Sequence, residues 1–160
     1  MDARRESEPS PMKHVTVERT SERELVVTRT FDAPARLVFE AWTRAELFKQ
    51  WWVPKSMGMT LRSIEMDVRT GGRYRLGFGD GMDFFGRYIE VTPPSRIVWT
   101  NEEGGENSSV TTVTFEEKDG QTLLVMSELY PSKEALDAAG GAADATHETF
   151  AQLDELLSAS

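Results

Sequence analysis

The sequence predicts an α+β domain in which a curved antiparallel sheet of seven strands packs against a long C-terminal helix, with two short helices directly after the first strand. Three observations lead to this prediction. Between residues 59 and 130, short runs of alternating apolar and polar residues are separated by glycine-rich and proline-rich turns, as in a β-meander. Residues 35–54 and 131–157 instead repeat apolar side chains at helical spacing. A curved sheet has one concave face to bury, and the C-terminal helix is the long element able to cover it.

Length and composition set the domain count. The chain has 160 residues, of which 39% are apolar, enough for one domain with a hydrophobic core. Residues 1–20 are polar, contain prolines and show no periodicity, so we expect a flexible tail there and a single domain over residues 21–160. No apolar run approaches the ~20 residues of a membrane span, and no signal-peptide pattern opens the chain. Together with the absence of cysteine, these features predict a cytoplasmic protein.

The net charge of −9 is distributed unevenly along the chain. Residues 1–100 carry 16 basic and 14 acidic side chains, whereas residues 101–160 carry 2 basic and 13 acidic ones. The acidic second half would repel phosphate groups, so we expect no nucleic-acid partner. It indicates either a solvated, self-repelling surface or a docking face for a basic protein.

An aromatic corner, residues 35–54, lies at the centre of the prediction and contains three of the four tryptophans. It indicates two short helices. The first has an apolar face with helical spacing, formed by Ala35, Val38, Phe39 and Trp42. Thr43 and Glu46 have the spacing of a capping box, so the second helix is expected to begin there and to end before Pro54.

Seven strands are predicted, and the last six are joined by short turns, which indicates an antiparallel meander. Their expected ranges are 24–31, 59–69, 73–79, 82–92, 96–100, 110–116 and 123–130. In the segment 82–92 both faces carry apolar residues, so the alternation does not decide which face is buried. The aliphatic residues Ile89 and Val91 favour burial of the face on which they lie. The final helix is expected over residues 131–157, with an interruption at Gly140–Gly141.

The architecture predicts a cavity between the sheet and the C-terminal helix, because a single helix cannot fill so wide a trough. An apolar and aromatic lining would suit a small apolar or amphipathic molecule. The candidate ligand-binding residues are Phe39, Trp42, Phe48, Trp52, Met66, Tyr74, Trp99, Met126, Glu128 and Phe150. The same residues would also form a filled core, and the sequence leaves both alternatives open.

Two expectations concern the direction of individual side chains. Trp51 and Trp52 are adjacent at a helix end, so one is expected in the core and the other at the mouth of the cavity or on the surface. Glu128 shares the alternation of Met126, which predicts an inward carboxyl group with a perturbed pKa, exposure at the strand end being the alternative. By the same parity, Arg29 is its expected partner.

Several strings of residues resemble one known superfamily. They are TRTFDAP (28–34), VFEAWT (38–43), WWVP (51–54), GGRY (71–74), GRYIEVTPP (86–94) and FAQLDELL (150–157). Over residues 24–158 the chain resembles the START-like (SRPBCC) superfamily, in the branch named for similarity to the C-terminal domain of the activator of heat shock protein 90 ATPase. The resemblance implies a helix-grip fold, as in START domains and birch-pollen-allergen-like proteins.

Three functions follow as expectations. The first is non-catalytic binding of a small hydrophobic or amphipathic ligand in the cavity. The second, which the resemblance implies, is a stress-related, co-chaperone-like module with a chaperone as partner. The third is a cyclase or hydrolase activity in the same cavity, as found elsewhere in the superfamily. The two non-catalytic functions are favoured because the sequence offers no nucleophile–base pair.

The remaining expectations are mostly negative. His14 and His147 lie far apart without the spacing of metal ligands, so neither a metal site nor a cofactor is predicted. No catalytic residue is assigned. A homodimer through an exposed sheet face or an edge strand stays open.

Overall fold

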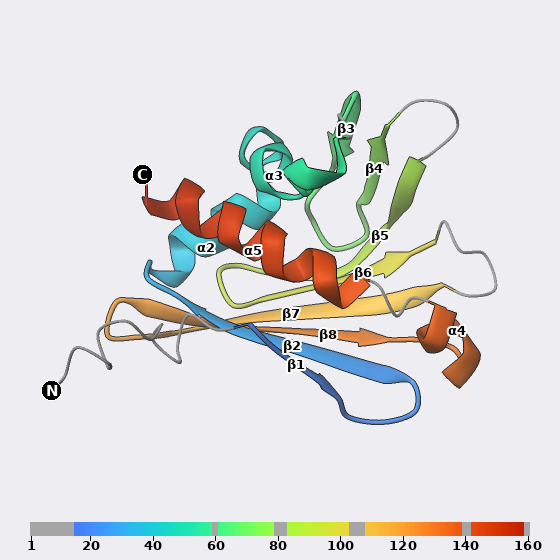
Figure 1. Cartoon of the computed structure of the whole chain (residues 1–160). Coiled ribbons are helices and arrows are strands. Elements are labelled where there is room, and N and C mark those ends of the chain that lie inside the picture. Colours follow the sequence, from blue (N-terminus) through green and yellow to red (C-terminus); the bar gives the residue numbers. More distant parts are fainter. Residues whose placement is uncertain (1–14, 59–60, 79–82, 103–107, 139–141, 159–160) are drawn as a thin grey trace, which may run out of the picture.

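The computed structural model describes residues 15–58, 61–78, 83–102, 108–138 and 142–158. It has the predicted α+β architecture, with a curved antiparallel sheet covered by helices on one face (Figure 1). The strands are β1 (Thr16–Arg19), β2 (Glu24–Phe31), β3 (Ser63–Met66), β4 (Arg73–Gly77), β5 (Asp83–Thr92), β6 (Arg96–Asn101), β7 (Ser109–Lys118) and β8 (Gln121–Leu129). The helices are α2 (Ala35–Thr43), α3 (Ala45–Trp51), the 3-10 turn η2 (Lys55–Met57), α4 (Lys133–Ala138) and α5 (Ala142–Ser158).

The sheet has eight strands in the order β1-β2-β8-β7-β6-β5-β4-β3, and all neighbouring strands are antiparallel. The strand beyond the seven expected is β1, which lies inside the segment predicted as a tail. Val17 of β1 pairs with Val27 of β2 and packs against the core. A short run with one inward β-branched residue was therefore enough to extend the sheet. β1 and β3 form its two edges.

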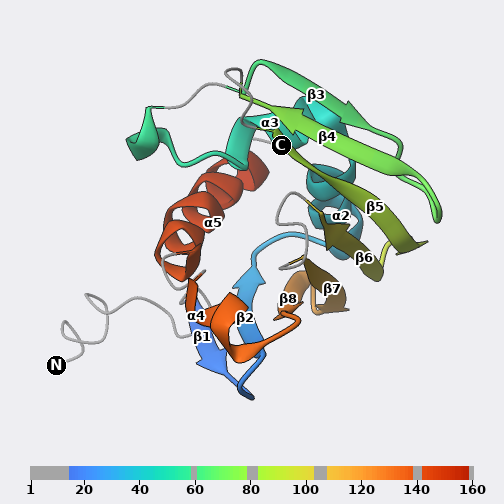
Figure 2. The same cartoon turned by 90° about the vertical axis from the view of Figure 1, so that its right-hand side faces the viewer.

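The sheet bends so that its two edges lie on different sides of the helices. In Figure 2, β3, β4 and β5 form one wall, β1, β2 and β8 lie on the opposite side, and α5 runs along the open side of the curve. α2 and α3 lie inside the curve (Figure 2). The prediction of a bent sheet around the terminal helix is thus confirmed.

A bulge in β5 contributes to this bend. Tyr88 pairs with Trp99 and Glu90 pairs with Val98, which leaves Ile89 without a partner on β6. A bulge of this kind bends a strand and increases its twist. The sequence favoured the face of Ile89 as the buried one, and at this point of β5 that prediction is wrong. Tyr88 is 6% exposed and faces the core, whereas Ile89 is 49% exposed.

Gly86 marks the place where β5 approaches β6 most closely. A Cβ atom at this position would overlap the backbone carbonyl oxygen of Thr100. The hydroxyl of Thr100 also accepts a hydrogen bond of 2.9 Å from the backbone N–H of Arg87. Glycine is therefore required here by space, and its close approach lets the neighbouring Tyr88 sit deep in the concave face.

The core is dominated by aromatic side chains from the helices. Trp51 is fully buried, and its indole N–H donates to the carbonyl oxygen of Ala41 at 2.9 Å. Phe150 of α5 packs edge to face on Phe31 of β2, with ring centroids 5.6 Å apart. Leu153, one turn later on α5, is also fully buried. Phe150 and Leu153 thus fill the trough of the sheet beneath α5.

The junction of α2 and α3 differs from the predicted capping box. Thr43 is the last residue of α2, and its hydroxyl donates to the carbonyl oxygen of Phe39 at 2.9 Å. The residue that precedes α3 is Arg44, in extended conformation, and no side chain caps the helix. With a single residue between the helices, the Thr43 hydroxyl bonds back along its own helix.

Candidate functional site

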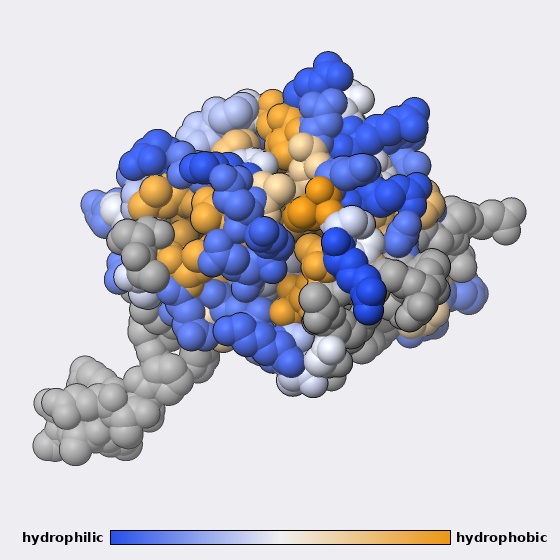
Figure 3. Space-filling view, turned by 90° about the horizontal axis from the view of Figure 1, so that it is seen from above, coloured by the Kyte–Doolittle hydropathy of each residue, from blue (hydrophilic) through white to orange (hydrophobic). Residues whose placement is uncertain are grey.

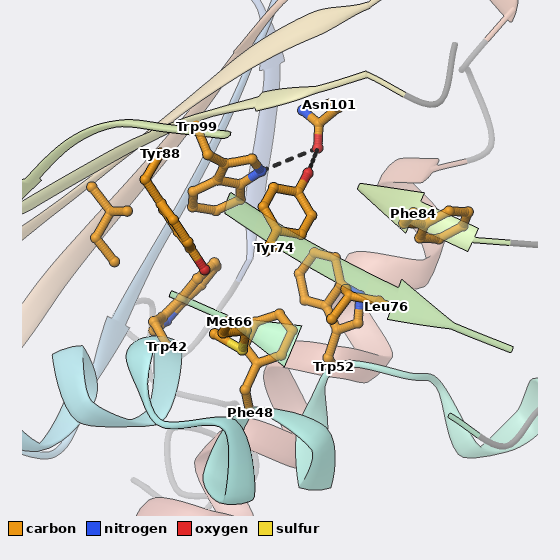
Figure 4. Close-up of a pocket in the computed structure, with 11 residues that line it drawn as sticks. Trp42, Phe48, Trp52, Met66, Tyr74, Leu76, Phe84, Tyr88, Trp99 and Asn101 are labelled. Carbon is orange, nitrogen blue, oxygen red and sulfur yellow. Dashed lines mark hydrogen bonds between the residues drawn. The ribbon is translucent and has the colours of Figure 1, made fainter. Parts of the chain in front are cut away.

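A pocket lies between strands β3–β6 and the two helices of the aromatic corner (Figure 4). Six of the ten candidate residues line it: Trp42, Phe48, Trp52, Met66, Tyr74 and Trp99. They come from α2, from the end of α3 and the segment after it, and from three different strands. Residues that are distant in the sequence are thus brought to one apolar hollow.

The other four candidates lie outside the lining of this pocket: Phe39, Met126, Glu128 and Phe150. Phe39 is buried edge to face on Phe115, with ring centroids 5.3 Å apart, and Met126 and Phe150 belong to the same core. None of the described residues of α5 lines the pocket, so its helical wall is α2 and α3 rather than the C-terminal helix. Between α5 and the sheet lies the buried ring of Phe150, packed on that of Phe31.

The pocket has five lining residues that the sequence reasoning did not single out: Leu76, Phe84, Tyr88, Ile97 and Asn101. Leu76 shares the alternation of Tyr74, and Ile97 and Asn101 share that of Trp99, so parity along the strands contained the signal for these three. Tyr88 was hidden by the bulge at Ile89. Phe84 shares the alternation of Tyr88, on the face of β5 that the sequence did not favour.

Trp52 and Phe48 form one wall of the pocket. The pocket is narrow, because the space that a water-sized molecule can occupy in it is about 40 Å³. The two rings are stacked with centroids 4.8 Å apart, and Trp52 is partly exposed whereas Trp51 is in the core. Figure 3, a view onto the face of α3 and α5, shows hydrophobic side chains in a narrow band between hydrophilic ones.

Asn101 organises the polar side of the pocket (Figure 4). Its Oδ1 accepts hydrogen bonds from the Tyr74 hydroxyl at 3.2 Å and from the Trp99 indole N–H at 3.1 Å. Its Nδ2 donates to the hydroxyls of Ser109 at 3.0 Å and Thr111 at 2.9 Å. Because both ends of this amide are used within the protein, Asn101 fixes the two rings.

Glu128 lies at the far end of the same row of polar groups. Thr111 and Tyr130 approach its carboxylate with their hydroxyl oxygens at 3.4 and 3.5 Å. Burial raises the pKa of Glu128, and the two hydroxyls offset only part of this effect. The carboxyl group faces inward as expected, but Glu128 is not among the residues that line the pocket.

Arg29 shares this inward face but has different partners from the one expected. Its Nη1 donates to the carbonyl oxygen of Phe150 at 2.9 Å, and its Nη2 lies 3.5 Å from a carboxylate oxygen of Asp154. The expected pairing with Glu128 is wrong, because Arg29 is the cross-strand neighbour of Leu124, four residues from Glu128 on β8. Arg29 therefore holds α5 to the sheet.

A second, more exposed hollow lies on the outer side of β4 and β5. Its charged lining consists of Arg73, Arg75, Arg87, Glu65 and Glu102. Arg87 pairs with Glu102 at 2.9 Å, and Arg75 pairs with Asp83 at 2.7 Å. Hydrogen bonds from Thr100 and Arg87 hold the pKa of Glu102 below its usual value. Because Arg75, Arg87 and Glu102 are already paired and the hollow is exposed, it is the weaker candidate.

The described residues contain neither a cluster of metal ligands nor a membrane-spanning helix. Within those ranges, no group of three or more His, Cys, Asp or Glu side chains is arranged to hold a metal ion. Of the helices seen there, none is long and apolar enough to cross a membrane.

A bent antiparallel sheet closed by a long C-terminal helix, with an apolar pocket beside it, defines a helix-grip protein. Residues 32–158 match the family described as Activator of Hsp90 ATPase homolog 1-like protein, and the chain belongs to this family. The match confirms the resemblance seen in the sequence. The family and the fold together support a ligand-binding or co-chaperone-like module in general terms.

Solved structures with the same fold come from several bacteria. A Rhodobacter sphaeroides protein is 25% identical with a TM-score of 0.79, over 91% of this chain and 99% of its own. A Mycobacterium smegmatis protein is 24% identical with a TM-score of 0.76, over 92% and 99%. A Nitrosomonas europaea protein is 22% identical with a TM-score of 0.76, over 88% and 97%. Comparison with curated proteins produced no match.

Proposed function

We propose that the protein binds a small, largely apolar molecule in the pocket between the aromatic corner and strands β3–β6. The observation that carries the proposal is the lining itself, where indole, phenyl, phenol and aliphatic side chains converge from both helices and four strands. Surfaces of this kind, with a few fixed polar groups, are typical of small-molecule sites. None of the lining residues in the described ranges is charged, which favours an uncharged ligand.

Binding requires the pocket to widen. A typical small-ligand pocket has a volume of about 300–1,000 Å³, whereas a water-sized molecule can at present occupy only about 40 Å³ of this pocket. Trp52 is the side chain best placed to move, because it is partly exposed whereas Trp42 and Phe48 beside it are buried. Turning it outward would break aromatic contacts worth about 0.5–1.5 kcal/mol each, an amount that a bound apolar ligand can offset.

Uptake of the neutral fluorophore N-phenyl-1-naphthylamine tests the proposal. Met66 and Glu65 are neighbours on β3, but Met66 lines the pocket whereas Glu65 lies on the outer face. Replacing Met66→Trp should fill the pocket and weaken probe binding about tenfold or more, while Glu65→Trp should leave it within about twofold of the wild type. Circular dichroism and thermal unfolding would show that both variants are folded.

Two results would contradict the proposal. The first is the absence of any saturable uptake by the wild-type protein, in titrations with the naphthylamine and with smaller apolar probes. The second is equal binding by the Met66→Trp and Glu65→Trp variants, which would place the bound probe outside this pocket.

A second candidate, a co-chaperone-like protein module, is favoured by one observation, the concentration of acidic side chains in residues 101–160. A docking face of this charge would bind a basic surface in a salt-sensitive manner. Pull-down with purified heat shock protein 90 at low and raised salt tests it. Association that disappears at raised salt would support the module, and no association at either salt would remove it.

A further inference from the structure

Two side chains of the pocket lining carry a hydrogen-bond donor without a partner among the described residues. The first is the indole N–H of Trp42, which is buried without a hydrogen bond among the described residues. The two other deeply buried indoles are satisfied, since Trp51 donates to Ala41 and Trp99 donates to Asn101. A buried N–H group without an acceptor is costly. The only other such side-chain atom among the described residues is Nε of Arg29, which lies outside the pocket lining.

The second donor is the hydroxyl of Tyr88, a buried residue of the pocket lining, for which no hydrogen bond to another described residue is seen; it is less completely enclosed than the Trp42 nitrogen. The other tyrosine of the pocket, Tyr74, donates to the backbone oxygen of Thr100 at 2.8 Å. Figure 4 shows the Tyr88 hydroxyl directed toward the Trp42 ring. The two residues also share a neighbour, because Tyr88 pairs with Trp99 and the Trp99 ring centroid lies 5.9 Å from that of Trp42.

We infer that Trp42 and Tyr88 together recognise an uncharged oxygen acceptor on the ligand, of the ketone, quinone, ester or amide type, attached to a flat apolar body. This inference rests on the proposed function. The flat body follows from the aromatic walls, where the rings of Phe48 and Trp52 are stacked and that of Trp42 lies across them. The acceptor follows from the two donors, since neither would be satisfied by a hydrocarbon.

The absence of charge on the acceptor follows from the electrostatics of the site. Burial, and to a smaller extent the negative charge of Asp67, raises the pKa of Tyr88, so its hydroxyl stays protonated and donates. Since the described lining contains no cation, a carboxylate would lose its hydration without gaining a counter-charge. A neutral carbonyl oxygen accepts both hydrogen bonds and is far less costly to bury.

Matched probes separate this inference from the binding proposal. Fluorene and 9-fluorenone have nearly the same shape, but only the ketone offers an acceptor. Wild-type protein should bind 9-fluorenone about tenfold more tightly than fluorene, as followed by quenching of tryptophan fluorescence. Tyr88→Phe should remove most of this preference while leaving fluorene affinity within about twofold, and Tyr130→Phe, outside the pocket, should leave both affinities unchanged.

Two spectroscopic signals report on the hydrogen bonds themselves. The carbonyl stretch of bound 9-fluorenone should move to lower frequency in the wild type and move back in Tyr88→Phe. One indole N–H resonance of ¹⁵N-tryptophan protein should shift downfield with 9-fluorenone and not with fluorene, and should be missing in Trp42→Phe.

The outcomes are distinct. If the two probes bind equally well, or if the preference survives in Tyr88→Phe, the acceptor inference is wrong while the binding proposal stands. Tighter binding of fluorene-9-carboxylate than of 9-fluorenone would overturn the requirement for a neutral group. If neither neutral probe binds, both the proposed function and the inference fail.

Discussion

Gln152 on α5 donates a hydrogen bond from its side-chain nitrogen to the backbone carbonyl oxygen of Trp51, at a distance of 2.9 Å. The same nitrogen donates to the carbonyl oxygen of Val53 at 2.9 Å, and the side-chain oxygen accepts from the backbone N–H of Lys55 at 2.9 Å. One buried amide thus satisfies three backbone groups where α3 ends. It fixes the segment that carries Trp52 to the C-terminal helix.

The first prediction concerns Gln152. Replacing Gln152→Leu should lower the free energy of unfolding by about 2–3 kcal/mol, because it leaves the carbonyl groups of Trp51 and Val53 without donors. Urea denaturation followed by circular dichroism measures this change. Gln50→Leu, on the exposed side of α3, should cost less than about 0.5 kcal/mol and serves as the control. Equal losses in the two variants would show that the Gln152 amide has no special role.

The second prediction concerns the attachment of α5 through Arg29. Arg29 is 6% exposed, and its guanidinium lies 4.7 Å from the centroid of the Phe31 ring, besides its contacts to Phe150 and Asp154. Arg29→Ala should destabilise the fold by about 3 kcal/mol, since it leaves a carbonyl group and a carboxylate without their partner. The expected loss lies at the lower end of the range for breaking a buried ion pair, because the Asp154 side chain is 28% exposed and remains partly solvated.

A matched control for Arg29 is Arg36 of α2. Arg36 pairs with Glu40 at 3.7 Å on the surface, and its side chain is 69% exposed. Arg36→Ala should change the free energy of unfolding by less than about 0.5 kcal/mol. Chemical denaturation of both variants makes the comparison. A loss in Arg29→Ala as small as that in Arg36→Ala would mean that α5 is held by its apolar residues alone.

The third prediction is a pH dependence that originates at Glu128. Burial raises its pKa in the folded state above the value of 4.5 expected in the unfolded chain. The folded protein therefore binds the proton more tightly, and the free energy of unfolding should fall as the pH rises from about 4.5 through the raised pKa. In Glu128→Gln this fall should be smaller, so the variant should gain stability relative to the wild type with increasing pH.

Unfolding by urea at several pH values from about 4.5 to about 8 measures the effect of Glu128. Glu134→Gln, on the exposed surface of α4, should follow the wild-type curve and is the control. Parallel curves for the wild type and Glu128→Gln would show that the carboxyl group is solvated in the folded protein. A steeper fall in the variant would contradict the direction of the shift.

Much of the fold was predictable because apolar periodicity records which face of each element is buried. β2 was expected over residues 24–31 and has those bounds. The spacing of Val38, Phe39 and Trp42 gave the buried face of α2, and all three are buried. The same alternation correctly placed Tyr74 and Trp99 on the concave face. These features depend on local pattern, which one sequence contains.

The parts that could not be predicted depend on geometry between elements. A bulge at Ile89 shifts the parity of β5 and turns Tyr88 inward, and no count of alternating residues detects such an insertion. The partner of Arg29 is set by how α5 lies across β2, which parity on β2 and β8 does not contain. The place of the pocket depends likewise on how completely Phe150 fills the trough.

β3 forms one side of the pocket through Met66, and it is a four-residue strand at the edge of the sheet. Its backbone is paired to β4 alone, so it is more readily opened than the strands inside the sheet, although Ile64 and Met66 pack against the core. If the pocket binds the proposed ligand, exchange of that ligand would draw on the local stability of this one short strand. Substitutions in β3 would then change access to the pocket more than they change the free energy of unfolding of the whole domain.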